Sequence, residues 1–219
     1  MAEILVINPN SSTFVTQSMD ACLDAVRSLS GNTMRCSTLE MGPPGIETDA
    51  HIAAVIPHLL ERILETPADA YVIGCFSDPG LESARASTQK PVVGIGEAAY
   101  LAALGLGRRF GIVSILAASV PRHARYVDRL GLLSRLAGDR PIGFGVSELQ
   151  GEAVMGQLAR VGRALRDDDG ADVLILGCAG LGSYRHALER ELGLPVVDPV
   201  QAAAAQACVT VTLGYGAKS

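Results

Sequence analysis

Residues 70–75 read Ala-Tyr-Val-Ile-Gly-Cys, and residues 173–178 read Val-Leu-Ile-Leu-Gly-Cys. Each stretch is a short apolar run that ends in Gly-Cys. Runs without polar alternation are typical of strands that a parallel sheet covers on both faces. Residues 91–93 and 195–197 both read Pro-Val-Val and follow their cysteines at nearly equal distances. Any two strand-helix units share some likeness, but landmarks that recur in this order favour a duplicated unit.

The rest of the chain alternates short β-branched runs with longer Ala- and Leu-rich stretches. We expect strands at residues 4–7, 35–39, 70–73, 91–93, 110–114, 142–146, 173–176 and 195–197. We expect helices at residues 12–29, 49–65, 79–87, 96–104, 121–130, 147–166, 181–192 and 200–213. This alternation predicts an α/β fold with parallel sheets and right-handed crossovers.

The repeat predicts two similar Rossmann-like lobes related by pseudo-twofold symmetry, with the active site in the cleft between them. The first lobe is expected at residues 1–104 and the second at residues 105–199, with the change of lobe near residues 105–109. A C-terminal helix at about residues 200–219 is expected to pack back onto the first lobe.

The composition excludes several classes of protein. Of the 219 residues, 48% are hydrophobic, and the mean hydropathy is +0.29, which argues against disorder. The net charge is −5 and no basic run is present, so we expect no nucleic-acid partner. No apolar stretch is long enough to cross a bilayer, and the first residues lack the plan of a signal peptide. We therefore expect a cytoplasmic protein with no membrane partner.

The cysteines form neither a disulfide framework nor a zinc motif. Their number is odd and no CxxC pair occurs among Cys22, Cys36, Cys75, Cys178 and Cys208. We interpret Cys22, Cys36 and Cys208 as packing residues within helix or strand patterns. The remaining two have equivalent places in the repeat.

The histidines give no metal pair at a recognised spacing. We interpret His51, His58, His123 and His186 as solvated or structural, and we expect no metal site.

Cys75 and Cys178 each end an apolar strand and precede a turn into a helix. Ligands of open parallel sheets bind outside the carboxyl ends of the strands, so both thiols are expected to face the cleft. Free backbone N–H groups and the positive end of a helix dipole favour a thiolate there. A buried cysteine that only packs is the alternative, and it is less convincing for two pseudo-symmetric positions.

Groups near the same strand ends are candidates for binding a substrate. Backbone N–H groups after Cys75 could hold an oxyanion or enolate, and small residues after Cys178 would let a ligand approach the backbone closely. Capping of the next helix explains several of these residues equally well. The predicted substrate-binding residues are Asn10, Ser11, Phe76, Ser77, Ser114, Ala179, Gly180 and Leu181.

Two facing thiols suit racemisation or epimerisation of a carbon acid. One thiolate removes a proton from a stereocentre beside a carbonyl, and the opposite thiol returns a proton to the other face. This chemistry requires no cofactor, in keeping with the lack of a nucleotide-binding or pyridoxal-phosphate motif.

Five stretches together resemble hydantoin racemase and allantoin racemase of the aspartate/glutamate racemase superfamily: residues 7–12, 41–47, 75–81, 91–98 and 177–180. The resemblance runs from residue 4 to about residue 213. It implies that Cys75 and Cys178 are the acid/base pair, that no cofactor is used and that the protein is a homo-oligomer. It also implies a small-molecule substrate, a 5-substituted hydantoin such as allantoin.

The residues at and after the two cysteines differ from those of other branches of the superfamily, and these differences narrow the predicted function. Arylmalonate decarboxylases have glycine at the first cysteine position, where Cys75 stands here. The superfamily's amino-acid racemases carry Asn-Thr after each cysteine, where this chain has Phe76-Ser77 and Ala179-Gly180. An amino-acid racemase or a maleate-isomerase-like enzyme is the nearest alternative function. A non-catalytic binding module or redox sensor is a further one.

Overall fold

The first lobe is built on a four-stranded parallel sheet. The structure, a computed structural model, describes residues 1–215. The strand order is β2-β1-β3-β4. The strands are β1 (Glu3–Asn8), β2 (Thr33–Thr38), β3 (Ala70–Ile73) and β4 (Val92–Gly94). Ile4, Leu5, Val6 and Ile7 are fully buried, because β1 lies in the middle of the sheet and helices cover both of its faces.

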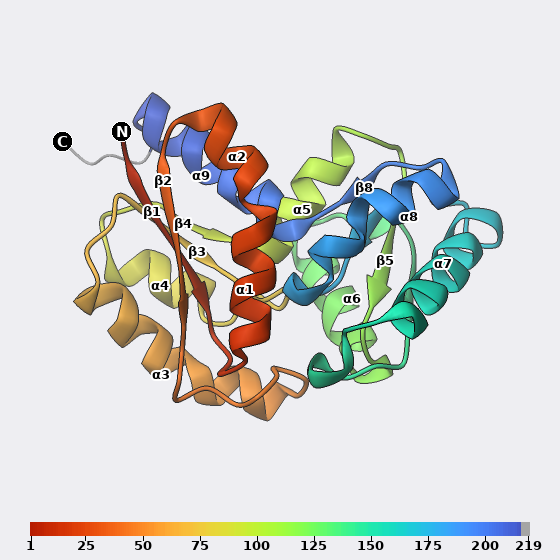
Figure 1. The fold of residues 1–219 in the computed structure, drawn as a ribbon, viewed down its shortest axis with the longest axis horizontal. Coiled ribbons are helices and arrows are strands. Elements are labelled where there is room, and N and C mark those ends of the chain that lie inside the picture. The colour runs from red at the N-terminus through yellow and green to blue at the C-terminus, as the bar shows by residue number, and fades with distance from the viewer. Residues whose placement is uncertain (216–219) are drawn as a thin grey trace.

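The second lobe repeats this arrangement. Its sheet is also parallel, with the order β6-β5-β7-β8. The strands are β5 (Phe110–Ser114), β6 (Leu136–Pro141), β7 (Val173–Leu176) and β8 (Val196–Val197). The equivalent order of the two sheets confirms the predicted two-lobe α/β fold, and the lobes lie side by side in Figure 1.

Helices flank both sheets (Figure 1). They are α1 (Thr13–Cys22), α2 (Asp24–Ser30), α3 (Asp49–Glu65), α4 (Leu81–Ser87), α5 (Ile95–Leu104), α6 (Val120–Arg129), α7 (Glu152–Asp167), α8 (Arg185–Leu192) and α9 (Pro199–Leu213).

The strand predicted at residues 142–146 is wrong. The strand of this region is β6 (Leu136–Pro141), and residues 146–148 form a 3₁₀ turn. β6 is an edge strand, and each of its residues is only partly buried. Its sequence therefore lacks the apolar run that marks the central strands.

Several predicted helices have different bounds. The helix predicted at residues 181–192 begins at Arg185, because residues 179–184 form a 3₁₀ turn. The helix predicted at residues 12–29 is interrupted at Leu23, which is buried between α1 and α2. The helix predicted at residues 147–166 begins at Glu152, because Gly151 adopts a φ of 98° that a right-handed helix excludes.

The last helix returns to the first lobe. α9 follows β8 in the chain, yet it packs against α5 and contacts β1, β3 and β4 (Figure 1). Residues 216–219, which the prediction included in this helix, lie outside the described residues. The predicted domain limits at residues 104 and 199 stay a prediction.

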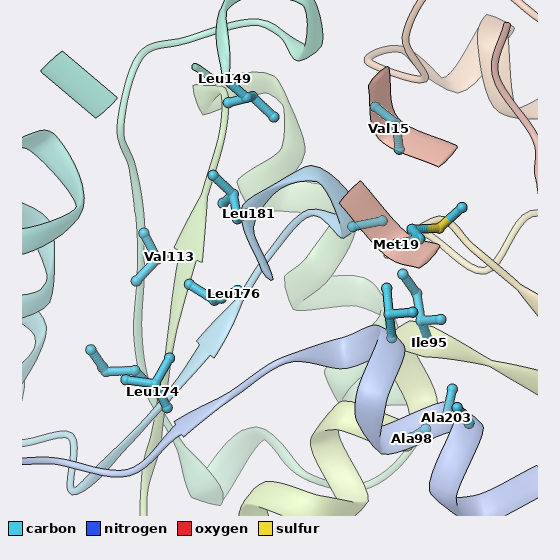
Figure 2. Packing of buried hydrophobic residues seen from close by; sticks show 14 of the residues in the cluster. Val15, Met19, Ile95, Ala98, Val113, Leu149, Leu174, Leu176, Leu181 and Ala203 are labelled. Atoms are coloured by element: carbon cyan, nitrogen blue, oxygen red, sulfur yellow. The ribbon is translucent and has the colours of Figure 1, made fainter. Parts of the chain in front are cut away.

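The lobes share a hydrophobic core. α1 packs against the 3₁₀ turn Ala179–Tyr184, which follows Cys178 in the second lobe. Val15 and Met19 of α1 are buried in the same cluster as Leu149 and Leu181, and Figure 2 shows these side chains around the turn. A helix of one lobe thereby supports the cysteine loop of the other.

Two buried carboxylates cap equivalent helices from different loops. Asp78, in the loop after Cys75, accepts N–H groups of Gly96 (2.9 Å) and Glu97 (2.7 Å) at the start of α5. Asp198, at the end of β8, accepts the N–H of Val200 (2.7 Å) at the start of α9. A Cβ at Gly94 would collide with the Asp78 carboxyl group, and a Cβ at Gly182 would collide with Asp198.

Within residues 1–215, no helix combines the length and the apolar character needed to cross a membrane.

Candidate active site

A close backbone contact fixes the position of each cysteine. The N–H of Gly74 donates to the carbonyl oxygen of Ile7 (2.7 Å), and the N–H of Gly177 donates to that of Val113 (2.9 Å). A Cβ at Gly74 would lie 2.9 Å from the Ile7 oxygen, and one at Gly177 would lie 2.8 Å from the Val113 oxygen. Both distances are too short for a methyl group. Glycine is therefore required before each cysteine, so that its strand can lie this close to the neighbouring strand.

The turn after each cysteine directs backbone N–H groups toward the thiol. Asp78 N–H donates to the Cys75 carbonyl (2.9 Å), and Leu181 N–H donates to the Cys178 carbonyl (3.2 Å). Inside these turns, the N–H groups of Ser77 and Gly180 interact with the sulfur atoms of Cys75 and Cys178 respectively. The two lobes thus present their thiols in the same way.

Both thiols line one narrow pocket between the lobes, with a free volume of about 30 Å³. The first lobe contributes seven of its residues and the second lobe eight: Asn10, Val15, Ile46, Gly74, Cys75, Phe76, Ser77, Ile115, Ser119, Arg122, His123, Val146, Gly177, Cys178 and Ala179.

Four of the predicted substrate-binding residues line this pocket, namely Asn10, Phe76, Ser77 and Ala179. The other four do not. Ser114 is fully buried and contacts His123 and Asp139, and Leu181 is fully buried in the shared core. Ser11 donates its N–H to the Pro43 carbonyl (2.9 Å), and the Gly180 carbonyl accepts from Ser18 Oγ (3.5 Å).

The pKa values of the two thiols are higher than the sequence suggests. Burial raises the pKa of Cys75 to about 12 and that of Cys178 to about 11. The N–H groups of Ser77 and Gly180 act in the lowering direction, as expected near a helix start, but desolvation of the charged form outweighs them. The expectation that this location favours a thiolate is therefore wrong in its net direction.

The two thiols also interact with each other. Negative charge on Cys178 raises the pKa of Cys75, so a second thiolate is disfavoured once the first has formed. The pocket therefore favours the state with one thiolate and one thiol over the state with two thiolates.

A cross-lobe contact that the sequence did not predict closes one side of the pocket. Glu47 Oε1 accepts the N–H of Val146 (2.9 Å), and Ile46 and Val146 both line the pocket. A Cβ at Gly45 would lie 2.7 Å from the Val146 Cβ, so glycine is needed for this approach. In the sequence, residues 41–47 were part of the resemblance to the racemase family, but that resemblance assigned no role to Gly45, Ile46 or Glu47.

Arg122 of α6 joins the second lobe to the Cys75 loop. Its guanidinium donates to Ser77 Oγ (3.1 Å), to Ser119 Oγ (3.2 Å) and to Asp49 Oδ1 (3.1 Å). Its positive charge lowers the pKa of Cys75, although burial dominates. Nothing in the local sequence of α6 distinguishes Arg122 from the other arginines of that helix.

Of the four histidines, His123 belongs to the pocket. It is 2% exposed and hydrogen-bonds to Ser114 and Asp139, so it is not solvated. His58 and His186 lie at the surface, and His51 accepts the N–H of Glu47 (3.3 Å). In the part of the chain that the structure describes, no three His, Cys, Asp or Glu side chains gather as metal ligands.

Comparison with known proteins gives the family. Residues 4–207 match the family model described as Asp/Glu/Hydantoin racemase. The chain belongs to this racemase family. The racemase is 38% identical to a hydantoin racemase from Paenarthrobacter aurescens, over 97% of this chain and 92% of the relative.

Solved structures of two relatives share the whole fold. An allantoin racemase from Pseudomonas fluorescens matches the racemase with a TM-score of 0.91 at 30% identity, over 97% of this chain and 92% of the other. One from Klebsiella pneumoniae matches with a TM-score of 0.90 at 34% identity, over 98% of this chain and 89% of the other. The predicted resemblance is thereby confirmed, and the racemase is an isomerase.

The close contact at Gly177 predicts a loss of stability in Gly177→Ala. The added methyl group must displace the Val113 carbonyl, and overpacking of this kind costs about 1–3 kcal/mol. Gly156→Ala is the matched control, because Gly156 lies in α7 with no atom close to its Cβ position. In a helix this change is expected to stabilise by about 0.5–1 kcal/mol. Urea unfolding measures both; equal stabilities of Gly177→Ala and the unchanged racemase would contradict the argument.

The coupling between the thiols predicts a pKa change in Cys178→Ser. Without the opposing sulfur, the pKa of Cys75 is expected to fall below its value in the unchanged racemase, because the raising effect of Cys178 is gone. Thiolate absorbance followed against pH measures this. A pKa of Cys75 that stays the same or rises would mean that the two thiols do not interact.

Proposed function

We propose that this racemase interconverts the enantiomers of 5-substituted hydantoins, allantoin included, by two-base proton transfer at C5 with no cofactor. The observation that carries the proposal is the presence of Cys75 and Cys178, from equivalent strand ends of two lobes, in the wall of one small pocket. The hydantoin racemase and allantoin racemases to which the chain is similar support this choice of substrate.

The chemistry of a hydantoin fits such a pocket. The ring is planar, and C5 carries an acidic hydrogen beside a carbonyl group. Removal of that proton leaves an enolate, which is flat at C5 and can accept a proton on either face. Two thiols on opposite sides of the ring would provide the base for one face and the acid for the other.

The proton balance exchanges the roles of the cysteines. The thiolate takes the C5 proton and becomes a thiol, while the electron pair of the C–H bond moves into the enolate. The opposite thiol then gives its proton to C5 from the other face and becomes the thiolate. The enzyme thus ends in the protonation state that suits the reverse reaction, and exchange with solvent returns it to the starting state.

A raised pKa has two opposing effects on this reaction. It makes the thiolate a stronger base toward a weak carbon acid. It also makes that thiolate scarce, since a group with a pKa near 11 is ionised in about one molecule in a thousand at pH 8.

Asn10 supplies a donor for a substrate carbonyl group. Its Oδ1 accepts from Asn8 Nδ2 (2.9 Å) and from the N–H of Ser12 (2.9 Å), which fixes the orientation of its amide. No partner of Asn10 Nδ2 occurs among residues 1–215, so its two N–H groups are available in the pocket. Donors of this kind stabilise an enolate oxygen as charge develops on it.

Amino-acid racemisation and maleate isomerisation remain the nearest alternatives. An amino acid would need a partner such as a guanidinium for its carboxylate, and the arginine that lines the pocket, Arg122, already binds Ser77, Ser119 and Asp49. A substrate panel of allantoin, 5-alkyl and 5-aryl hydantoins, aspartate, glutamate and maleate separates the three activities, with decay of optical rotation as the readout for the chiral substrates. Turnover of an amino acid or of maleate, without any hydantoin, would overturn the proposal.

Two further expectations accompany the proposal. We expect a homo-oligomer, as the family resemblance implies, and light scattering after gel filtration tests it. We also expect a cytoplasmic location, which fractionation of the source cells tests.

The two-base mechanism predicts different effects on racemisation and on proton exchange. Cys75→Ser and Cys178→Ser should each lower racemisation at least about 100-fold, because either the base or the acid is lost. Exchange of the C5 hydrogen with deuterated water should persist in each variant for one enantiomer, and the favoured enantiomer should differ between the two. Cys208→Ser, a buried cysteine outside the pocket, is the control. Normal racemisation by both single variants would refute the mechanism.

The raised pKa values predict an alkaline pH profile. The free enzyme needs one thiolate, and both thiols are protonated at neutral pH. The value of kcat/KM should therefore rise with pH, by close to tenfold per unit between about pH 7 and pH 10, and level off as the first thiol ionises near its pKa of about 11. Initial rates on allantoin across this range test the expectation. A flat profile would place the reactive pKa well below these values.

A further inference from the structure

His123 is the centre of a buried polar cluster beside Phe76 of the Cys75 loop. Its Nδ1 lies 2.9 Å from Asp139 Oδ2 and 3.1 Å from Ser114 Oγ, and the Ser114 hydroxyl donates to Asp139 Oδ1. The ring is 2% exposed and stands edge-on to Phe76, with centroids 5.0 Å apart and an interplanar angle of 86°. Helix α6, strand β5 and strand β6 thus hold the imidazole in one orientation.

These contacts fix which atom of the imidazole carries a proton. The single hydrogen of the Ser114 hydroxyl is used on Asp139, so the serine oxygen can only accept from Nδ1. A carboxylate oxygen of Asp139 also accepts from Nδ1. Nδ1 is therefore the donor in this cluster.

The charge of Asp139 argues for a protonated imidazole. Its side chain is 3% exposed, and within residues 1–215 no Lys or Arg side chain pairs with it. A buried carboxylate without a counter-charge is strongly unfavourable. His123 is the cation within reach, and an imidazolium carries a second proton on Nε2.

The Nε2 atom has no partner among the described residues, and His123 lines the pocket that both cysteines share. An N–H group that borders a pocket and lacks a protein acceptor can donate to a ligand or to water there. The reaction of the proposed function supplies such an acceptor, the carbonyl oxygen beside C5.

We propose that His123 is a further catalytic residue, which donates a hydrogen bond from Nε2 to the substrate carbonyl oxygen that becomes the enolate oxygen. Asp139 and Ser114 are positioning residues that hold the ring and its charge. The inference rests on the proposed function, because the enolate belongs to that reaction.

The donor acts on the transition state. When the thiolate takes the C5 proton, negative charge moves from sulfur to the carbonyl oxygen, and the imidazolium stabilises the charge where it arrives. The imidazolium keeps its proton throughout, so the proton balance of the two cysteines is unchanged. An interaction that strengthens as charge develops raises kcat more than it lowers KM.

Variants at position 123 test this role. His123→Ala should lower kcat on allantoin about 100-fold, as loss of a preorganised donor does, and change KM much less. His123→Gln, whose amide N–H₂ reaches a similar place, should recover part of the loss. His186→Gln is the matched control, because His186 is exposed on α8 and lies outside the pocket. Circular dichroism and thermal unfolding report whether each variant folds.

A second measurement uses the unchanged protein. In protein labelled with ¹⁵N at histidine, His123 should give the nitrogen shifts of an imidazolium, assigned by their loss in His123→Gln. Unsubstituted hydantoin, which binds without a net reaction, should then shift the Nε2 resonance more than that of Nδ1. A neutral ring, or an Nε2 resonance that hydantoin leaves in place, would overturn the donor role.

The outcomes separate this inference from the proposed function. If the unchanged protein neither binds hydantoin nor racemises any hydantoin, the proposed function fails. If it racemises allantoin and folded His123→Ala retains kcat within about threefold, the function stands and the role of His123 is refuted.

Discussion

The positions of the two pocket thiols depend on a close contact between the backbones of neighbouring strands. In each lobe the glycine before the cysteine lies against the carbonyl end of the neighbouring strand, through the Gly74–Ile7 and Gly177–Val113 hydrogen bonds. This contact sets where each strand ends and where its turn begins. Because the same contact occurs in both lobes, the thiols enter the cleft from equivalent positions. The loops, the helix starts and the cross-lobe contacts are all arranged around these two points.

Burial and hydrogen bonding act in opposite directions on the thiols. The turn after each cysteine offers an N–H group to the sulfur, which favours the thiolate, while the low-polarity surroundings favour the thiol. Burial has the larger effect, so both groups are weak acids. A site that excludes water enough to raise these pKa values also strengthens every hydrogen bond that a ligand makes within it.

The sequence was informative where a residue's environment is set locally. Central strands such as β3 and β7 are buried on both faces, so their apolar runs predicted the sheets and the places of Cys75 and Cys178. The edge strand β6 carries no such run and was missed. His123 and Asp139 come from different elements and meet only in the folded chain, and a pattern along the sequence cannot show that pairing. The contact between Glu47 and Val146 escaped prediction for the same reason.

The two capping carboxylates have a consequence for the internal symmetry. In the first lobe, Asp78 lies on the cysteine loop and Gly94 lies at the end of the strand. In the second lobe, Gly182 lies on the cysteine loop and Asp198 lies at the end of the strand. In each lobe, the space between the cysteine loop and the strand end holds one carboxylate. Grafting the loop that carries Asp78 into the second lobe would place two acids in a single space, and the reverse graft would leave helix α5 uncapped. The halves of this protein are thus alike in outline but not interchangeable piece by piece, and a chimera would have to exchange loop and strand end together.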